Sequence, residues 1–468
     1  MWALVVVIAR ASLPYQLDYE EGNILNAAVR IAHGLSPYPD PHAFPNALNP
    51  YGPVLYFVIA ALVKIFGVTL LPGRFLVIAC GIAIAALIGI VVKRETESIA
   101  AGIGFGALFL CSPIVQFWWP LLRVDLVGLV LTLMGLVVFQ RNTPLNPKKV
   151  EWGTIVAGVL FVLAIFTKHT LIAAPAACVV WALLNRKRKS AVQLMACCAV
   201  LGTMAFAIGE LATHRFLGFA LFRMHPDPYN WSAYTDALQQ VITIHPLLAV
   251  LSFILLIGIV RDRKASLPFI YLLLSALTAF TVGKAGSNFN HVLELIAALC
   301  MAAGAGWKYV AEQTGIRQIG PALALLIAYV TVQSSRELMF EPRSSGSEQV
   351  IAVLRHEPDA PILSENTGAV VLAGKTPLVS NTFVYTQLVK YGGWSDADLL
   401  AMLRAKSIPA VLIDSTRRQL WSKEMLQTLH ANYRLAGKFE CRYAGLMFVP
   451  KNQEKAASEL TGKATGNR

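Results

Sequence analysis

Long apolar runs recur along this chain, and they constrain its fold more than any other feature. Runs long enough to cross the hydrocarbon core of a bilayer as helices can be drawn at roughly 73–92, 98–117, 121–140, 152–168, 170–185, 190–211, 246–260, 265–283, 290–306 and 318–335. Charged residues make up only 14% of the chain, whereas soluble domains carry about a quarter. The sequence therefore predicts a mainly α, polytopic membrane protein.

Two further apolar segments are harder to assign. Residues 1–12 are apolar apart from Arg10 and reach about half the length of a spanning helix. We interpret them as the outer end of a first span whose beginning is short or missing. Residues 53–71 contain Lys64 and end in a turn-like segment at 71–74. Lys64 favours an amphipathic helix at the membrane interface, which leaves about eleven transmembrane helices, the first of them short.

Basic residues concentrate in five connections between the predicted spans. An even number of spans separates each of these connections from the next. These connections are Lys93-Arg94, Arg141 with Lys148-Lys149, 186–189, 261–264, and Lys308 with Arg317. They therefore share one side of the membrane, which the positive-inside rule makes the cytoplasm. In the first outer loop, 13–72, the charged residues before residue 53 are four acidic and one basic. This loop is predicted to lie outside, as is everything after about residue 336. We expect a multi-pass protein of the inner (plasma) membrane.

The composition changes from Glu341 onward to that of a small soluble α/β domain. Ala410–Ile413 and Gly445–Val449 are typical of strands, and Ser395–Ala405 has helical spacing with a possible N-cap at its start. Because this region follows an outward-facing span, we expect it to lie outside the cytoplasm.

Three parts of the chain are predicted. Residues 1–340 form the transmembrane domain, residues 341–452 the extracytoplasmic α/β domain, and residues 453–468, rich in Lys, Ala, Gly and Thr, a disordered tail.

The first outer loop places Asp18, Glu20 and Glu21 within four residues, just beyond a membrane span. A partly desolvated carboxylate at this depth can deprotonate an acceptor hydroxyl or amine, or bind a cation. The alternative is structural: Asp18 caps a helix that runs to about Gly34, with Glu20 and Glu21 in its first turn. Both interpretations can hold together. Farther along, Tyr38 and Tyr56 are expected to anchor the loop at headgroup level.

Ionisable residues also lie at the ends of spans. Arg123 and Asp125 open one span, Lys168 and His169 interrupt an apolar stretch, and Lys284 lies in a polar connection. Such residues are costly at membrane depth and face protein or water. Several cations on the face that holds the carboxylates predict an anion site, such as one for a lipid-linked phosphate. The alternative is that Arg123 pairs with Asp125 and that Lys168 extends to the membrane surface.

Several common sites have no support in the sequence. There is no Walker lysine loop, no GxGxxG after a strand and no GxSxG elbow. The seven cysteines lack zinc-ligand spacing, and no aromatic-basic pattern points to nucleic acid. The sequence identifies no cofactor, but the carboxylates of the first outer loop could bind a divalent metal.

Several short motifs follow one another along the membrane region: Asp18-Tyr19-Glu20-Glu21-Gly22, Asn49-Pro50-Tyr51-Gly52-Pro53-Val54-Leu55-Tyr56 ahead of Phe66-Gly67, Arg123-Val124-Asp125, Phe166-Thr167-Lys168, and Gly283-Lys284-Ala285-Gly286-Ser287-Asn288. Together they resemble the multi-spanning glycosyltransferases of the GT-C class, which includes bacterial aminoarabinose transferases and protein mannosyltransferases. The motifs cover most of the membrane region, to about residue 335.

The resemblance implies transfer of a sugar, of hexosyl or pentosyl type, from a polyprenyl-phosphate donor to a lipid, glycan or protein acceptor on the outer face of the membrane. It makes the acid of the first outer loop the catalytic base, Asp18 first and Glu21 second. The residues that it implies for substrate binding are Tyr51, Arg123, Asp125, Lys168, His169, Lys284 and Asn288.

Two other functions stay open on the residues alone. A transporter or flippase of an anionic lipid-linked substrate would also gather cations and carboxylates at one membrane face, although no paired repeat is visible in the sequence. A noncatalytic scaffold that binds a partner through its C-terminal domain is the third possibility.

Overall fold

The structure is a computed structural model of the whole chain. It describes residues 2–141, 152–314, 345–414, 421–441, 443 and 445–451, together with the single residues 323, 325, 328 and 329. The predicted span 318–335 falls largely outside the described residues, and the predicted tail 453–468 falls entirely outside them. The chain divides into two compact units, which we describe separately.

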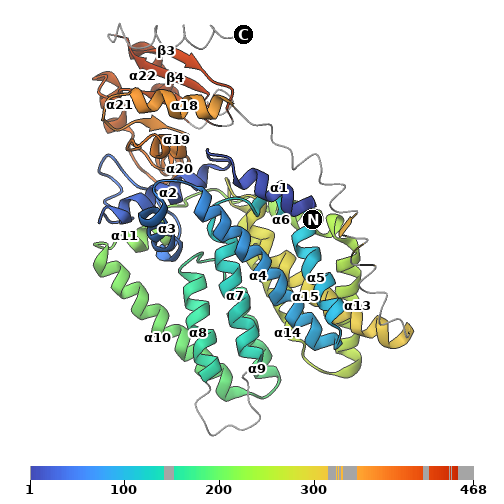
Figure 1. The fold of residues 1–468 in the computed structure, drawn as a ribbon. Helices are drawn as coiled ribbons and strands as arrows, with labels where there is room; N and C mark the ends of the chain where they lie inside the picture. The colour runs from blue at the N-terminus through green and yellow to red at the C-terminus, as the bar shows by residue number, and fades with distance from the viewer. Residues whose placement is uncertain are drawn as a thin grey trace. The chain divides into compact units, whose positions relative to one another are not determined.

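The first unit contains residues 1–11, 74–208 and 228–341 and consists of helices (Figure 1). Its helices are α1 (Trp2–Ala11), α4 (Leu71–Thr96), α5 (Ile99–Cys111), α6 (Pro113–Trp118), α7 (Val124–Arg141), α8 (Trp152–Ile165), α9 (Ala173–Leu184), α10 (Arg188–Ala212), α12 (Trp231–Ile244), α13 (Pro246–Asp262), α14 (Leu267–Thr278), η1 (Ala279–Gly283), η2 (Phe289–Val292) and α15 (Leu293–Thr314). Helices α7 and α8 pack together, as do α13 and α15 and α9 and α14.

Among the described residues, four continuous helices have the length and composition of membrane spans: α4, α7, α10 and the segment from η2 through α15. A fifth candidate is the pair α12 and α13, which is bent by 94° at His245-Pro246. Shorter apolar helices occupy other predicted spans, including α5, α8, α9 and α14. The chain is therefore a multi-pass helical membrane protein in its composition and elements.

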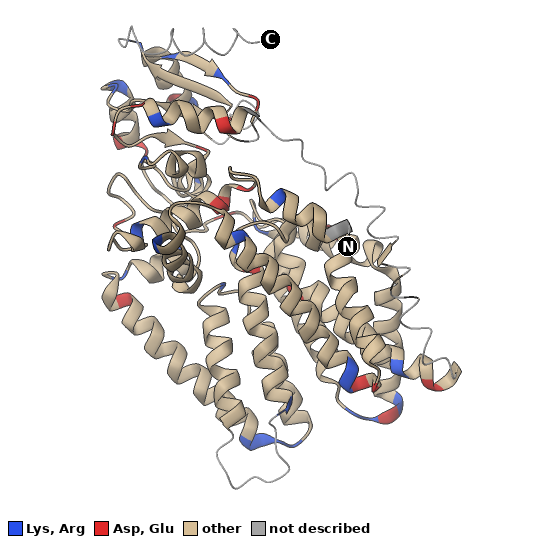
Figure 2. Cartoon of the chain, viewed as in Figure 1, with Lys and Arg blue, Asp and Glu red and all other residues tan. Residues whose placement is uncertain are grey.

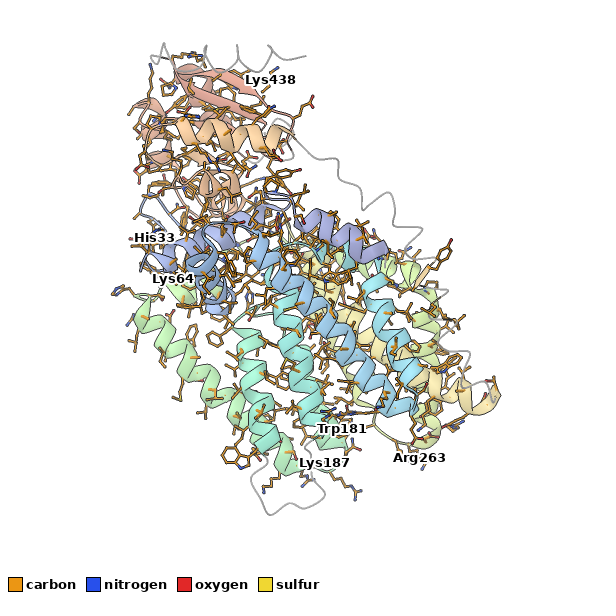
Figure 3. All side chains as sticks on the ribbon, viewed as in Figure 1. His33, Lys64, Trp181, Lys187, Arg263 and Lys438 are labelled. Atoms are coloured by element: carbon orange, nitrogen blue, oxygen red, sulfur yellow. The ribbon has the colours of Figure 1, made fainter. Side chains whose placement is uncertain are left out.

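The charges follow the expected pattern within this unit. The bodies of its helices carry few charged residues, and Lys, Arg, Asp and Glu gather mainly toward helix ends (Figure 2). Lys187 and Arg263, from two of the predicted cytoplasmic connections, lie toward the same end of the helices (Figure 3). This arrangement agrees with the grouping that the positive-inside rule predicts for these two connections.

The second unit contains residues 12–73, 209–227 and 342–468. Its elements are α2 (Tyr19–Ala32), α3 (Pro53–Phe66), α11 (Phe216–Phe222), α18 (Ser345–His356), β1 (Leu363–Ser364), α19 (Thr367–Leu372), α20 (Thr382–Tyr391), α21 (Ala397–Arg404), β2 (Val411–Ile413), α22 (Lys423–Asn432), β3 (Tyr433–Lys438) and β4 (Leu446–Pro450). The first outer loop thus packs with the C-terminal region as one compact body.

A four-stranded sheet of order β1-β2-β4-β3 forms the β part of this unit. Strands β1 and β2 are parallel, with Leu363 opposite Val411. Strand β4 is antiparallel to both β2 and β3, and Val411 lies opposite Phe448. The two strands and the helix expected from sequence are present as β2, β4 and α21.

The predicted turn at 71–74 is wrong. Helix α3 ends before Gly67, whose φ of +79° suits a residue without a side chain, and α4 already begins at Leu71. Pro72 is tolerated there because the first turn of a helix needs no backbone N–H donor from that position. The turn therefore lies a few residues earlier, between Gly67 and Leu70.

Helix α3 has 14 residues and is about 21 Å long at 1.5 Å per residue, which is shorter than a hydrocarbon core of about 30 Å. One face, including Leu55, Ile59 and Val63, is buried, whereas Phe57, Ile65 and Phe66 are exposed. An apolar face left uncovered on a helix too short to span is what an interfacial helix requires.

Candidate active site

The acidic segment at the start of α2 forms a capping box. The Asp18 carboxylate accepts a hydrogen bond from the backbone N–H of Glu20 at 3.2 Å. The Glu21 carboxylate reaches back and accepts from the backbone N–H of Leu17 at 2.7 Å and of Asp18 at 3.3 Å. These bonds satisfy donors that the first turn of a helix leaves open. The structural interpretation of this segment is therefore correct, and it does not exclude a catalytic one.

The three carboxylates differ in how far they reach solvent. Glu21 is 0% exposed and Glu20 is 2% exposed, whereas Asp18 is only half-buried. A general base must come within hydrogen-bond distance of the proton that it accepts. Of the three, Asp18 is the most accessible to a substrate. Glu21 instead accepts hydrogen bonds from the backbone at Leu17 and Asp18 and so orients the backbone of Asp18.

Residues from the C-terminal region contact the start of α2. Asn381 donates from Nδ2 to Oε1 of Glu20 at 3.1 Å, and the Oε1 of Gln16 accepts from the backbone N–H of Gly368 at 2.8 Å. The backbones of Gly22 and Gly368 approach so closely that a Cβ on Gly22 would collide with the Gly368 nitrogen. Sequence reasoning missed these partners, because no local pattern links positions so far apart.

The Asn49–Tyr56 segment is ordered by hydrogen bonds within the loop. Tyr38 donates from its hydroxyl to the carbonyl of Tyr51 at 2.6 Å, and Asn49 donates to the carbonyl of Pro37. Tyr51 is half-buried. Tyr38 and Tyr56 are buried side by side, with ring centroids 6.2 Å apart, so their predicted role as headgroup anchors is wrong. Burial also raises the pKa of Tyr38 well above its usual value.

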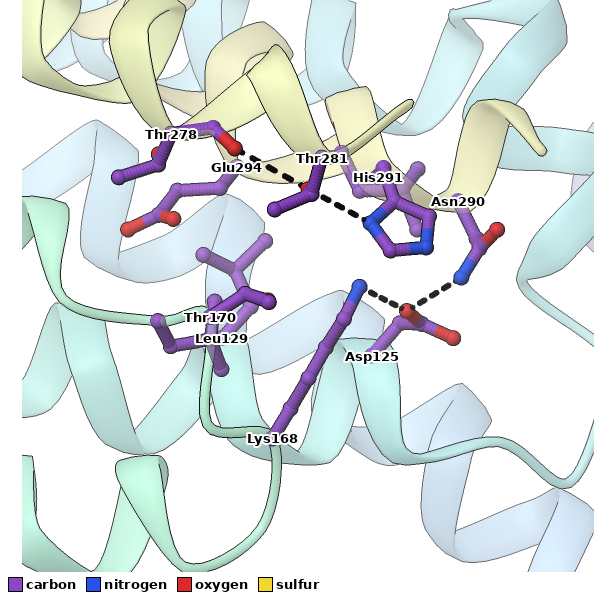
Figure 4. A pocket seen from close by; sticks show the side chains of 11 residues that line it. Asp125, Leu129, Lys168, Thr170, Thr278, Thr281, Asn290, His291 and Glu294 are labelled. Atoms are coloured by element: carbon purple, nitrogen blue, oxygen red, sulfur yellow. Dashed lines mark hydrogen bonds and ion pairs between the residues drawn. The ribbon is translucent and has the colours of Figure 1, made fainter. Parts of the chain in front are cut away.

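In the helical unit, Asp125 is the centre of a buried polar cluster (Figure 4). It lies in the first turn of α7, where the helix dipole favours a carboxylate. Arg123 Nε lies 3.0 Å from Asp125 Oδ2, and Lys168 Nζ lies 2.6 Å from Asp125 Oδ1. Asn290 Nδ2 also donates to Asp125 Oδ1, at 2.9 Å. Arg123 additionally lies over the ring of Trp118, 5.0 Å from its centroid.

The structure therefore brings together Arg123, Asp125 and Lys168 from the predicted site. The pairing of Arg123 with Asp125, weighed as an alternative, is present. The alternative that Lys168 extends to the membrane surface is wrong, because Lys168 is only 4% exposed and bonds to Asp125. A buried cation needs a nearby counter-charge more than a lysine at the interface does.

A small cavity adjoins this cluster. Lys168, Thr281, His291 and Glu294 contribute to its walls (Figure 4). Thr281 Oγ1 lies 2.8 Å from His291 Nδ1. The space that the centre of a water molecule can reach is about 10 Å³, room for roughly one water. Glu294 and Asn290 were not predicted; the only sequence signal for Glu294 is a lone acid inside an apolar run.

The remaining predicted residues lie apart from the walls of this cavity. His169, next to Lys168, is half-buried. Lys284 is exposed, in a segment whose backbone pairs with Tyr229. Asn288 is exposed and caps η2 by accepting from the backbone N–H of Phe289 at 2.8 Å. None of the three is among the residues that line the Asp125 cavity in the described part of the chain.

The described residues hold no group of three or more His, Cys, Asp or Glu side chains arranged to bind a metal ion.

Comparisons with known proteins bear on this arrangement. The model of the dolichyl-phosphate-mannose-protein mannosyltransferase family matches residues 49–210. No protein with a curated functional description matches the sequence. Among solved structures, the chain is similar to ArnT from Cupriavidus metallidurans bound to undecaprenyl phosphate, with a TM-score of 0.64, 14% identity and coverage of 96% of each chain.

Two more distant structures share the fold. The oligosaccharyltransferase of Archaeoglobus fulgidus, tethered with an acceptor peptide, matches with a TM-score of 0.53 and 13% identity over 95% of this chain and 74% of the other. The mycobacterial arabinofuranosyltransferase AftD matches with a TM-score of 0.50 and 16% identity over 96% of this chain and 40% of the other. The resemblance predicted from short motifs is confirmed: this chain has the fold of the GT-C class glycosyltransferases.

Proposed function

We propose that this protein is a membrane glycosyltransferase that moves a sugar from a polyprenyl-phosphate-linked donor to an acceptor at the outer face of the inner membrane. The observation that carries the proposal is the fold likeness to ArnT, which extends over 96% of both chains and includes a structure bound to undecaprenyl phosphate. The family match over residues 49–210 supports the same class of donor. In this proposal the first outer loop and the C-terminal α/β domain are both extracytoplasmic.

Asp18 is the proposed general base. Its carboxylate takes the proton of an acceptor hydroxyl or amine while the acceptor oxygen or nitrogen forms a bond to the anomeric carbon of the donor sugar. The bond between that carbon and the phosphate oxygen breaks, and the electron pair leaves with the polyprenyl phosphate. The partial exposure of Asp18 supports this role, because the other two carboxylates of the segment are buried.

Glu21 is proposed as a positioning residue. It accepts hydrogen bonds from the backbone N–H groups of Leu17 and Asp18, and it thereby holds the backbone that carries the base. A group used in this way has little freedom to accept a substrate proton. This assignment chooses between the two acids that the sequence left open.

We propose that cationic side chains at the outer face bind the phosphate of the donor. Arg123 and Lys168 share one carboxylate, so the Arg123-Asp125-Lys168 cluster keeps a net positive charge. Lys168 Nζ has three donors, and it lines the small cavity as well as bonding to Asp125. The exposed Lys284 adds charge on a polar connection, and Tyr51, His169 and Asn288 stay proposed as substrate-binding residues.

The proposal is tested by transfer from a labelled donor. Purified protein in liposomes is incubated with a radiolabelled polyprenyl-phosphate sugar and extracts of envelope glycans, lipids or proteins as acceptors. Asp18→Asn should lower transfer by at least about 10², the smaller end of the effect of a general base. Glu21→Gln keeps an acceptor oxygen and should retain more activity.

Three results would decide against parts of this scheme. Full transfer by Asp18→Asn with none by Glu21→Gln would exchange the two roles. Full transfer by both variants would leave this segment with its capping role alone. Movement of the labelled lipid across the bilayer without transfer to any acceptor would favour the flippase alternative.

A further inference from the structure

A second cavity lies within the α/β part of the second unit. It is walled mainly by residues of α20, of α21 and of the start of α22, including Tyr385, Lys390, Asp396 and Trp421. Its volume is about 250 Å³, just below the roughly 300 Å³ at which drug-sized pockets begin. The cavity therefore has room for one small ring-shaped ligand, and not for a long chain.

One wall of this cavity holds a buried polar group that has no hydrogen-bond partner in the described part of the chain. Tyr385 is 3% exposed, and its buried hydroxyl has no hydrogen-bond partner among the described residues. Burial and the nearby carboxylates of Asp396 and Asp398 raise the pKa of Tyr385, so the phenol stays protonated and able to donate at neutral pH. Leaving such a group unsatisfied is unfavourable, and a ligand that bonds to the hydroxyl would recover this cost.

Hydrogen bonds hold three other polar groups of the wall in place, those of Asp396, Trp421 and Ser422. Trp421 donates from Nε1 to Oε1 of Glu365 at 2.7 Å, which fixes the plane of its ring. Ser422 donates from its hydroxyl to Oδ2 of Asp396 at 3.1 Å, and the same oxygen of Ser422 accepts from the backbone N–H of Met425. The cavity is thus bordered by ordered groups that need little rearrangement to bind a ligand.

We propose that this cavity binds one neutral monosaccharide unit of a glycan acceptor; the acceptor role rests on the function proposed above. An apolar ligand would leave the Tyr385 hydroxyl unsatisfied, and an anionic one would face the Asp396 carboxylate. A sugar avoids both costs because each of its hydroxyls can donate and accept. Lys390 supplies a donor and Asp396 an acceptor, and the rings of Tyr385 and Trp421 supply apolar surface for the C–H groups.

Helix α20 connects this cavity with the proposed base segment. Asn381 at its N-terminus bonds to Glu20 of α2, and Tyr385 and Lys390 follow one to three turns later. A helix of 10 residues is about 15 Å long. A sugar in the cavity would therefore lie within about one helix length of α2, a distance that a short oligosaccharide acceptor can cover.

The test measures sugar binding directly on the full-length protein. The protein is purified in a detergent without a sugar headgroup, and saturation-transfer NMR titrations are run with methyl α-mannopyranoside, methyl β-galactopyranoside and N-acetylglucosamine. At least one of them should bind. Tyr385→Phe removes only the hydroxyl and should raise the dissociation constant roughly 2–10-fold, the value of one neutral hydrogen bond. The matched control is Tyr391→Phe, an exposed tyrosine of the same helix, which should leave binding unchanged.

Two outcomes would overturn the inference: no saccharide of the set binds, or both tyrosine variants weaken binding equally while their unfolding temperatures match that of the wild type. The proposed function fails separately. Asp18→Asn should bind the sugar as the wild type does while transfer is lost. A wild-type protein that transfers a sugar but binds none of the probes contradicts only the cavity. One that binds a probe but transfers to no acceptor contradicts the acceptor role.

Discussion

Asn381 donates a hydrogen bond from Nδ2 to Oε1 of Glu20 at 3.1 Å, across 361 positions of the chain. The same side chain accepts from the backbone N–H of Val384 through Oδ1 and so caps α20. One residue of the C-terminal region therefore orders a local helix and holds the carboxylate next to the proposed base. Glu20 is 2% exposed, so this contact replaces hydrogen bonds that water would otherwise provide.

Replacing Asn381 by Asp should separate these two roles. Aspartate can still cap α20, but it removes the donor and places a second carboxylate against Glu20. We expect a loss of stability of about 1–3 kcal/mol, as for a buried group deprived of its partner, measured by denaturant unfolding. If Asp18 is the base, kcat for transfer should fall more than KM rises.

Asn230→Asp is the control for this experiment. Asn230 is an exposed N-cap in the helical unit, and its side chain accepts from the backbone N–H of Ser232. Both stability and transfer should stay near wild-type values in this variant. Equal losses in the two variants would mean that capping, and not the contact with Glu20, accounts for the effect.

The cluster around Asp125 should behave as a buried ion network. Lys168→Met removes one of its two cations and leaves Asp125 with Arg123 and Asn290. Breaking a buried pair in this way costs about 3–5 kcal/mol, which thermal unfolding in detergent would detect. The double variant Lys168→Met with Asp125→Leu should lose further stability, because it also removes the carboxylate that the buried Arg123 bonds to. A single variant as stable as the wild type would contradict the network.

Cysteine labelling tests the predicted topology. Ala43 in the first outer loop, Ser395 before α21 and Lys264 after α13 are all exposed. An impermeant maleimide added to intact spheroplasts should label Ala43→Cys and Ser395→Cys, and it should label Lys264→Cys only after lysis. Protection of Ala43→Cys alone would mean that 53–71 crosses the membrane. Protection of Ser395→Cys would contradict an extracytoplasmic C-terminal domain.

The native Cys441 should give little background in that experiment. Burial raises the pKa of the Cys441 thiol to about 11, and its Sγ donates to the carbonyl of Tyr443. Since the thiolate is the reactive form, alkylation in the folded protein should be slow at pH 7 and should rise about tenfold per pH unit up to the pKa. Iodoacetamide labelling at pH 7, 8 and 9, analysed by mass spectrometry, measures this. A rate independent of pH would contradict the raised pKa.

The sequence by itself determined the class of the protein and most of its local elements. The apolar runs predict α4, α7, α10 and α15 because a helix that crosses a bilayer needs about twenty apolar residues whatever its neighbours. The helix start at Asp18 was also predictable, since a capping box involves residues within a few consecutive positions. The resemblance to the GT-C class was also visible in the sequence, because each motif that carries it lies within a few consecutive positions.

Only the tertiary structure decided which side chains meet. Lys168 was predicted as a site residue, with the membrane surface as the alternative, but its partner was not predicted: it bonds to Asp125 across 43 positions, together with the unpredicted Asn290. Asn381 reaches Glu20 from the far end of the chain. These partnerships depend on which helix faces pack together, and the periodicity of a helix reports only that a face is apolar or polar. The identity of the residue on the other side of the contact is set by the fold.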